Sequence, residues 1–179
     1  PVAFLQRFAG ARVIGVDPNP RSLAYCRARC PAGMEILANA FWTTAGETIV
    51  FHLPRGKDML PKGADGVSGS LDPSHEYVEG GERIETRSVD LDALLSRAGR
   101  TECDVLKLDV EGAEYALLDA LVASGRIRAA RQVLIEFHHG VTRHTPDDTR
   151  RIVDSLAAAG FRLIHTESRN YIFRRESAQ

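Results

Sequence analysis

The stretch DVLKLDVEGAE, residues 104–114, contains a predicted strand that leads directly into a predicted helix. Apolar and charged residues alternate from Leu106 to Glu111, and the first half predicts a strand over residues 104–109. Its second half opens a predicted helix over residues 113–122, whose leucines recur at helical spacing. Gly112 permits the tight turn between them, because glycine adopts backbone conformations that other residues avoid. A strand that leads directly into a helix is the repeating unit of a parallel sheet.

Strand and helix patterns alternate on both sides of this stretch. Further strands are predicted over residues 12–17, 35–38, 48–53, 84–89 and 131–137, and further helices over residues 1–9, 21–29, 91–95 and 147–159. Residues 161–166 and 171–174 predict a closing hairpin. We therefore predict an α/β fold with a Rossmann-like, mainly parallel sheet, helices on both faces and an antiparallel C-terminal hairpin.

Length and composition indicate a single domain over residues 1–179. A compact chain of this size buries roughly 70% of the surface that its unfolded form exposes, which is enough for one core. Residues 54–83 contain six glycines and three prolines, and we interpret them as a mobile, lid-like insertion.

Charge and cysteine content exclude several kinds of partner. Lys and Arg number 23 against 24 for Asp and Glu, so no basic excess favours nucleic-acid binding. No apolar run approaches the roughly 20 residues of a membrane span. The three cysteines lack zinc-site spacing and are expected to be reduced thiols of a cytoplasmic protein. Abundant alanine and arginine favour a GC-rich bacterial source.

The polar residues that end predicted strands are the candidate site residues, because ligands bind beyond the carboxyl ends of strands in open α/β sheets. They are Asp17, Asn39, Asp109, Glu111, Glu136, His138 and His139. Asp17 carries two oxygens that can accept both hydroxyls of a ribose. The alternative is that it caps the turn that follows.

The charges of residues 104–114 predict a functional cluster. If the strand stays extended, Lys107, Asp109 and Glu111 share one face, because side chains alternate along a strand. A lysine in a strand buried on both faces needs a charged partner, which Asp109 or Glu111 supplies. Glu114 falls in the first helical turn, where the helix dipole favours an anion. The alternative is a salt-bridged strand end and a capped helix.

The next strand ends in EFHH, residues 136–139. An imidazole accepts a proton near neutral pH, so His138 or His139 is a candidate base, with Asp109 as a third. Glu136 and Glu111 would orient the base and the substrate. With Asp109 and Glu111 a histidine here could also bind a divalent metal, but we predict no metal. No role is predicted for the four remaining histidines, His52, His75, His144 and His165. Trp42 either walls a nucleobase or fills the core.

Six segments carry a resemblance to a known family: VIGVDPNP (13–20), EILANAFWTTAGETIVFHL (35–53), VDLDALL (89–95), DVLKLDVEGAE (104–114), VLIEFHH (133–139) and GFRLIHTESRNYIFRR (160–175). Their order and spacing resemble the FkbM family of S-adenosylmethionine-dependent methyltransferases over nearly the whole chain. KLDVEGAE is the most specific of these elements.

The resemblance implies a class I methyltransferase sheet, S-adenosylmethionine as cofactor, and O-methylation of a hydroxyl on a sugar or secondary metabolite. Asp17 would bind the cofactor's ribose, and Asn39 and Ala40 would line its adenine. Asp109, Glu111 and Gly112 would lie near its methionine end and the transferred methyl. The candidate cofactor-binding residues are Asp17, Asn19, Asn39, Ala40, Asp109, Glu111 and Gly112. The candidate catalytic residues are Asp109, Glu136, His138 and His139.

The family's first strand and glycine-rich loop do not occur in this sequence, so we expect the chain to begin inside the natural protein. Two other functions stay open. One is a nicotinamide-dependent Rossmann oxidoreductase, because Asp17 would serve the ribose of NAD equally well. The other is a degenerate, non-catalytic Rossmann-like domain that binds a partner protein.

Overall fold

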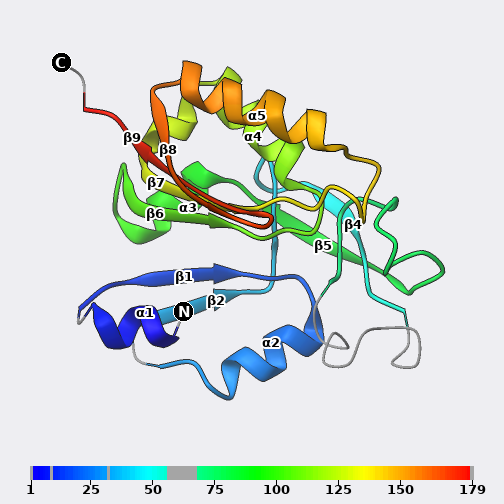
Figure 1. Ribbon diagram of the computed structural model, residues 1–179. Coiled ribbons are helices and arrows are strands. Elements are labelled where there is room, and N and C mark those ends of the chain that lie inside the picture. Colours follow the sequence, from blue (N-terminus) through cyan, green and yellow to red (C-terminus); the bar gives the residue numbers. More distant parts are fainter. Residues whose placement is uncertain (1, 9, 32, 56–67, 178–179) are drawn as a thin grey trace.

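The computed structural model describes residues 2–8, 10–31, 33–55 and 68–177 (Figure 1). Its first half contains α1 (Val2–Arg7), β1 (Val13–Val16), α2 (Pro20–Arg27), β2 (Met34–Leu37), β3 (Ala40–Phe41), β4 (Thr48–His52), β5 (Arg83–Val89) and α3 (Leu91–Ala98). Its second half contains β6 (Cys103–Leu108), α4 (Glu114–Ala123), the 3₁₀ helix η2 (Arg126–Ala129), β7 (Ala130–Glu136), α5 (Pro146–Ala158), β8 (Phe161–Glu167) and β9 (Asn170–Arg175). The described helices are all too short or too polar to cross a membrane.

The strands β6, β7, β9 and β8 form one sheet in that order. β6 and β7 are parallel and place Leu108 opposite Ile135, whereas β9 runs antiparallel to both β7 and β8. α4 and α5 lie together over one face of this sheet, in the upper part of Figure 1. The predicted strand–helix unit and the predicted C-terminal hairpin are both confirmed.

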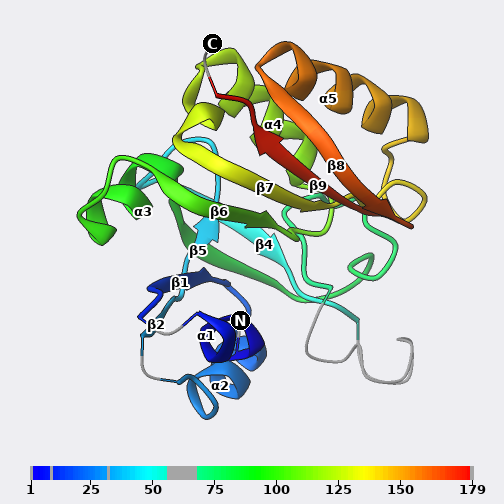
Figure 2. The ribbon, with the colours of Figure 1, turned by 60° about the vertical axis from the view of Figure 1, so that its left-hand side comes forward.

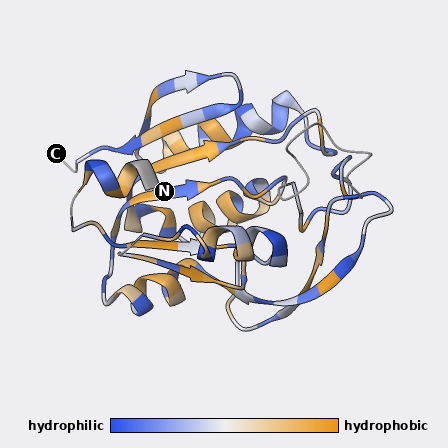
Figure 3. Cartoon of the chain, turned by 90° about the horizontal axis from the view of Figure 1, so that it is seen from below, coloured by the Kyte–Doolittle hydropathy of each residue, from blue (hydrophilic) through white to orange (hydrophobic). Residues whose placement is uncertain are grey.

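The core lies between this sheet and its helices. The α4 leucines Leu117 and Leu118 are buried, as are Phe137, which directly follows β7 in the chain, and Phe173 on β9. Burying one such side chain contributes about 1.5–3 kcal/mol, so this layer accounts for much of the fold's stability. Figure 3 shows the apolar colour concentrated in the inner strands and the helices beside them.

The remaining strands form separate sheets within the described residues. β3 pairs in parallel with β5, which pairs antiparallel with β4, and β1 pairs in parallel with β2. In Figures 1 and 2, β1 and β2 lie with α1 and α2 at the bottom of the molecule. The structure is thus an α/β fold with parallel and antiparallel pairs. The Rossmann-like sheet stays a prediction.

The expectation that the strand of residues 104–109 stays extended as far as Glu111 is wrong, because β6 ends at Leu108. The backbone then turns through two left-handed residues, with φ of 52° at Glu111 and 104° at Gly112, before α4 begins. The alternation of side chains cannot continue here, because left-handed residues depart from the extended backbone of a strand. Sequence patterns also missed the short strand β3, which contains only Ala40 and Phe41.

The glycine- and proline-rich segment lies partly outside the described residues, which omit 56–67. Its described part packs against the rest of the chain. Ser70 and His75 are fully buried, and Ser70 exchanges two backbone hydrogen bonds with His52 on β4. Mobility of this segment stays a prediction, and its described residues reach the ends of β6 and β7.

Candidate active site

Three predicted residues meet where β6 and β7 end. Asp109 directly follows β6, Glu111 lies in the turn after it, and His138 lies two residues beyond β7. The His138 Nε2 atom is 3.2 Å from Glu111 Oε2 and 3.9 Å from Asp109 Oδ1. The parallel pairing of the two strands brings their carboxyl ends together, as the sequence predicted. We call Asp109, Glu111 and His138 the strand-end cluster.

Glu114, at the start of α4, fixes the orientation of His138. The side chain of Glu114 is fully buried, and its Oε1 accepts the backbone N–H of His138 at 2.7 Å. The same oxygen lies 3.3 Å from His138 Nδ1, and Oε2 accepts the N–H of Gly112 at 2.8 Å. A buried carboxylate requires such donors. The sequence predicted only a favourable helix-dipole position for Glu114.

The surroundings of His138 favour a positive charge. Burial of the ring opposes protonation, but the hydrogen bond to Glu114 and the negative charges of Glu114, Glu111 and Asp109 outweigh it and raise the pKa of His138. The imidazole of His138 thus lies between three carboxylates, those of Asp109, Glu111 and Glu114.

His75 completes the environment of Glu111, although no role was predicted for it. Its buried ring places Nε2 at 3.0 Å from Glu111 Oε2, while Nδ1 accepts the backbone N–H of Tyr77 at 3.2 Å. Because Nδ1 accepts, Nε2 carries the hydrogen and donates it to Glu111. No sequence pattern signals this contact, since 36 positions separate the two residues.

The turn that carries Glu111 is tightly packed. Ser70 Oγ donates to the Glu111 carbonyl oxygen at 2.5 Å. A Cβ atom on Gly112 would come within 2.8 Å of Thr142 Cγ2, so only glycine fits there without movement. A non-glycine residue with φ of 52°, such as Glu111, costs about 1–3 kcal/mol and persists where surrounding contacts impose it.

Lys107 pairs with Asp109 as predicted, at 2.5 Å between Nζ and Oδ2. The expectation that Lys107 is buried is wrong, because its side chain is 57% exposed. In the described residues β6 pairs on one side only, with β7, so solvent reaches the lysine. The pair leaves Asp109 Oδ1 as the oxygen that faces His138.

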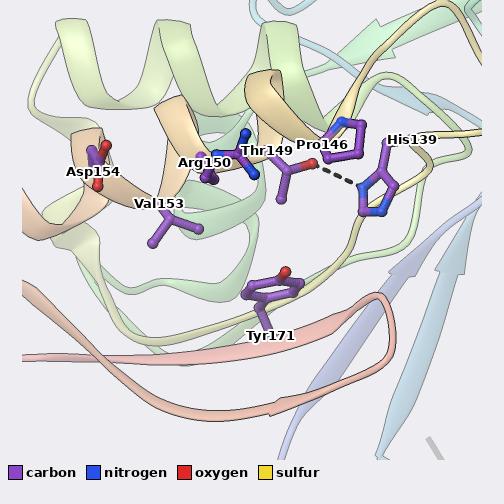
Figure 4. Close-up of a pocket in the computed structure, with 7 residues that line it drawn as sticks. All are labelled: His139, Pro146, Thr149, Arg150, Val153, Asp154 and Tyr171. Atoms are coloured by element: carbon purple, nitrogen blue, oxygen red, sulfur yellow. Dashed lines mark hydrogen bonds between the residues drawn. The ribbon is translucent and has the colours of Figure 1, made fainter.

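Two predicted catalytic residues, Glu136 and His139, contact other residues than those of the strand-end cluster. Glu136 Oε1 is 3.8 Å from a guanidinium nitrogen of Arg169. His139 Nδ1 is 3.0 Å from Thr149 Oγ1 on α5. His139 also lines a pocket of about 280 Å³ between the first turns of α5 and Tyr171 (Figure 4). Its other lining residues are Pro146, Thr149, Arg150, Val153 and Asp154.

The predicted cofactor-binding residues of the first half follow β1 and β2. Asp17 Oδ1 accepts the backbone N–H of Asn19 at 2.8 Å, so the turn-capping contact does form. Burial raises the pKa of Asp17 despite the hydrogen bonds that Asn19 and Ser22 give it. Asn39 Nδ2 donates to the Arg87 carbonyl oxygen at 3.0 Å.

The side chains of Ala40 and Trp42 are directed toward protein neighbours. Ala40 is 2% exposed within β3, and half-buried Trp42 packs against the core. Of the two interpretations of Trp42, as a wall for a nucleobase or as a residue that fills the core, the second fits its contacts.

The strand-end cluster can act on a proton or hold a cation. One ligand atom from each of Asp109, Glu111 and His138 lies within 4.8 Å of the others. The carboxylates and the buried imidazole are suited to proton transfer and to metal binding alike.

Comparison with known proteins adds one finding. A family model described as "Methyltransferase FkbM domain" matches residues 1–163 of the chain. Searches of curated proteins and of solved structures return no match.

Proposed function

The chain belongs to the FkbM methyltransferase family, and we propose that it transfers a methyl group from S-adenosylmethionine to a hydroxyl oxygen of a sugar or secondary metabolite. The observation that carries this proposal is the strand-end cluster, with buried Glu114 behind His138. Such a cluster of titratable groups at a sheet's carboxyl edge is suited to deprotonating an acceptor.

The residues that would hold the cofactor are those at the carboxyl ends of β1, β2 and β6. Asp17 offers a half-buried carboxylate, whose two oxygens could accept both hydroxyls of a ribose. Asn19 would assist it, Asn39 and Ala40 would border the adenine, and Asp109, Glu111 and Gly112 would border the methionine end. When bound, S-adenosylmethionine supplies an electrophilic methyl group on a positively charged sulfur.

The chain's own residues must orient the acceptor hydroxyl, exclude water and receive a proton. An aligned oxygen must approach the methyl carbon to about 3–3.5 Å. A residue of the strand-end cluster would receive this proton, because His138 Nε2 and Asp109 Oδ1 lie 3.9 Å apart and could both approach the same hydroxyl group. We propose that His139 contacts the acceptor from the pocket that it lines, and that Glu136 orients the same part of the site.

A calorimetric titration of S-adenosylhomocysteine into the full-length protein tests this function. We expect micromolar binding that weakens at least about tenfold, or about 1.4 kcal/mol, in Asp17→Ala. Asp104→Ala is the matched control, because Asp104 is an exposed carboxylate near the opposite end of β6.

The alternative outcomes separate the competing functions. A folded protein that binds NAD but not S-adenosylhomocysteine would be a nicotinamide-dependent oxidoreductase. A folded protein that binds neither would support the partner-binding domain.

A further inference from the structure

We propose that Asp109, Glu111 and His138 bind a divalent transition-metal ion that interacts with the acceptor oxygen. The metal site itself follows from the geometry of these three residues. Its role toward an acceptor rests on the proposed methyltransferase function.

The distance between His138 Nε2 and Glu111 Oε2 already fits two ligands of a single ion, and all three ligand atoms of the site lie within 4.8 Å of one another. Two ligand atoms that are each about 2.1 Å from a metal, at tetrahedral or octahedral angles, lie about 3.0–3.5 Å apart. His138 Nε2 and Glu111 Oε2 are 3.2 Å apart, and Nε2 and Asp109 Oδ1 are 3.9 Å apart. A small side-chain rotation of exposed Asp109 would close the longer distance.

The buried imidazole is directed into this site without a hydrogen bond on that side. The His138 side chain is only 4% exposed, and its Nδ1 is next to Glu114. In the part of the chain that the structure describes, Nε2 makes ion-pair contacts but no hydrogen bond. A metal ion would take the place of a proton on Nε2: with a hydrogen on Nδ1, the Nε2 lone pair is directed toward the oxygens of Glu111 and Asp109, and all three atoms can bind one cation.

The contact with Glu114 is the second feature typical of a metal-binding histidine. Such a histidine usually donates its other ring N–H to a carboxylate, which fixes the tautomer and the orientation of the ring. Glu114 provides this carboxylate and is itself held by the N–H groups of Gly112 and His138. Glu114 is therefore a positioning residue for the metal site.

The cluster contains more carboxylates than cationic side chains. Asp109, Glu111 and Glu114 contribute three carboxylates, and Lys107 contributes one ammonium group. Two negative charges thus remain uncompensated around His138, and one divalent ion balances them.

The ligand types indicate which ions bind. An imidazole nitrogen with carboxylates suits Mn²⁺, Co²⁺ or Zn²⁺ better than Mg²⁺ or Ca²⁺, which prefer oxygen ligands alone. Asp109 is 39% exposed, so an open side of the site can admit the acceptor. An open coordination position is typical of catalytic rather than structural metal sites.

An ion at this position would stabilise the negative charge that develops on the acceptor oxygen. In the reaction a carbon–oxygen bond forms while the carbon–sulfur bond breaks. The electron pair of that bond stays on sulfur, and the hydroxyl proton passes to the carboxylate of Asp109, which is exposed on one side and can release it to solvent.

The test is calorimetric titration of the full-length apoprotein with Mn²⁺, Zn²⁺ and Mg²⁺, together with the visible absorption spectrum of the Co²⁺ form. We expect one Mn²⁺ or Zn²⁺ per chain, bound at least about tenfold more tightly than Mg²⁺. Asp109→Asn and His138→Gln should each weaken binding by at least about tenfold, and Glu114→Gln by about 10–100-fold. His165→Ala, an exposed histidine on β8, is the control and should bind as the wild type does.

Two results would overturn the metal site. One is a folded wild-type protein that binds none of these transition metals. The other is binding that Asp109→Asn and His138→Gln leave unchanged. Circular dichroism of every variant separates loss of the site from loss of the fold.

Titration of the wild type with S-adenosylhomocysteine keeps this inference distinct from the proposed function. Cofactor binding without transition-metal binding would overturn the metal site and leave the methyltransferase proposal intact. Metal binding without cofactor binding would overturn the methyltransferase proposal and leave the metal site intact.

Discussion

The orientation of His138 depends on Glu114, whose carboxylate is fully buried. Three N–H groups point at this carboxylate, from the Gly112 backbone, the His138 backbone and the His138 ring. One side chain thereby joins the β6–α4 turn to the end of β7. Its position also sets which ring nitrogen of His138 faces Asp109 and Glu111.

Glu114→Ala should therefore be strongly destabilising, because it leaves several buried donors without an acceptor. We expect a loss of about 3–5 kcal/mol in the free energy of unfolding, measured by urea denaturation. Glu114→Gln retains an acceptor oxygen and should cost less. Glu167→Ala, at an exposed position, should stay within about 0.5 kcal/mol of the wild type. Equal stability of Glu114→Ala and Glu167→Ala would contradict this role.

Gly112 provides a second prediction at the scale of single residues. Its φ of 104° opposes a side chain, and so does Thr142 Cγ2, which would lie only 2.8 Å from a Cβ atom here. Gly112→Ala should lower the free energy of unfolding by about 1–3 kcal/mol. Adding Thr142→Ser removes Cγ2 but keeps the hydroxyl that donates to the His138 carbonyl oxygen. The double variant should recover part of the loss, and no recovery would leave backbone strain as the whole cause.

Among the elements, α5 has the clearest local determinants. Thr145 Oγ1 accepts the N–H of Asp148, and Asp148 Oδ2 accepts the N–H of Thr145, which together form a capping box. Pro146 occupies the first turn, where its missing N–H costs nothing. The helix thus begins where its sequence predicts, and its N-terminal end lies beside His139.

Thr145→Ala should cost about 1 kcal/mol of unfolding free energy at neutral pH, and Thr145→Ser should cost less. Hydrogen bonds from Thr145 lower the pKa of Asp148. A depressed carboxyl pKa stabilises the fold above the unfolded-state pKa, and this contribution is lost as the pH falls through the folded-state pKa. The stability difference between wild type and Thr145→Ala should therefore shrink in acid. A difference that grows below the ordinary aspartate pKa would contradict the capping role.

At the scale of the whole molecule, the site joins segments that are distant in sequence. The described residues 68–83 bring Ser70 and His75 onto the turn after β6, and β7 brings His138 from the other side. The Gly/Pro-rich segment therefore forms part of the site's wall through its described residues.

Ser70→Ala tests this long-range contact. The Ser70 hydroxyl donates to the Glu111 carbonyl oxygen and accepts the Asp72 N–H, so its loss leaves two buried groups unpaired. We expect a loss of about 1–3 kcal/mol in thermal or urea unfolding. Ser96→Ala on the exposed side of α3 is the control. If the proposed metal site exists, Ser70→Ala should also weaken Mn²⁺ binding, because Glu111 loses its anchor.

Local sequence patterns predicted most of the elements and the strand ends where site residues were expected. Apolar periodicity and the 104–114 turn predicted β6, α4, β7 and the β8–β9 hairpin. Parallel pairing then required Asp109, Glu111 and His138 to lie near one another, and they do. These features follow from local pattern and strand direction, which a sequence carries directly.

Which side chains surround these residues depends on tertiary packing, which local patterns do not predict. Glu114 turns inward to His138, His75 reaches Glu111 across 36 positions, and Glu136 pairs with Arg169 outside the cluster. The left-handed turn at Glu111 also ends the alternation that the sequence suggested. Such contacts depend on how separate segments pack and on which buried polar groups must find partners. Those requirements arise only once the chain is compact.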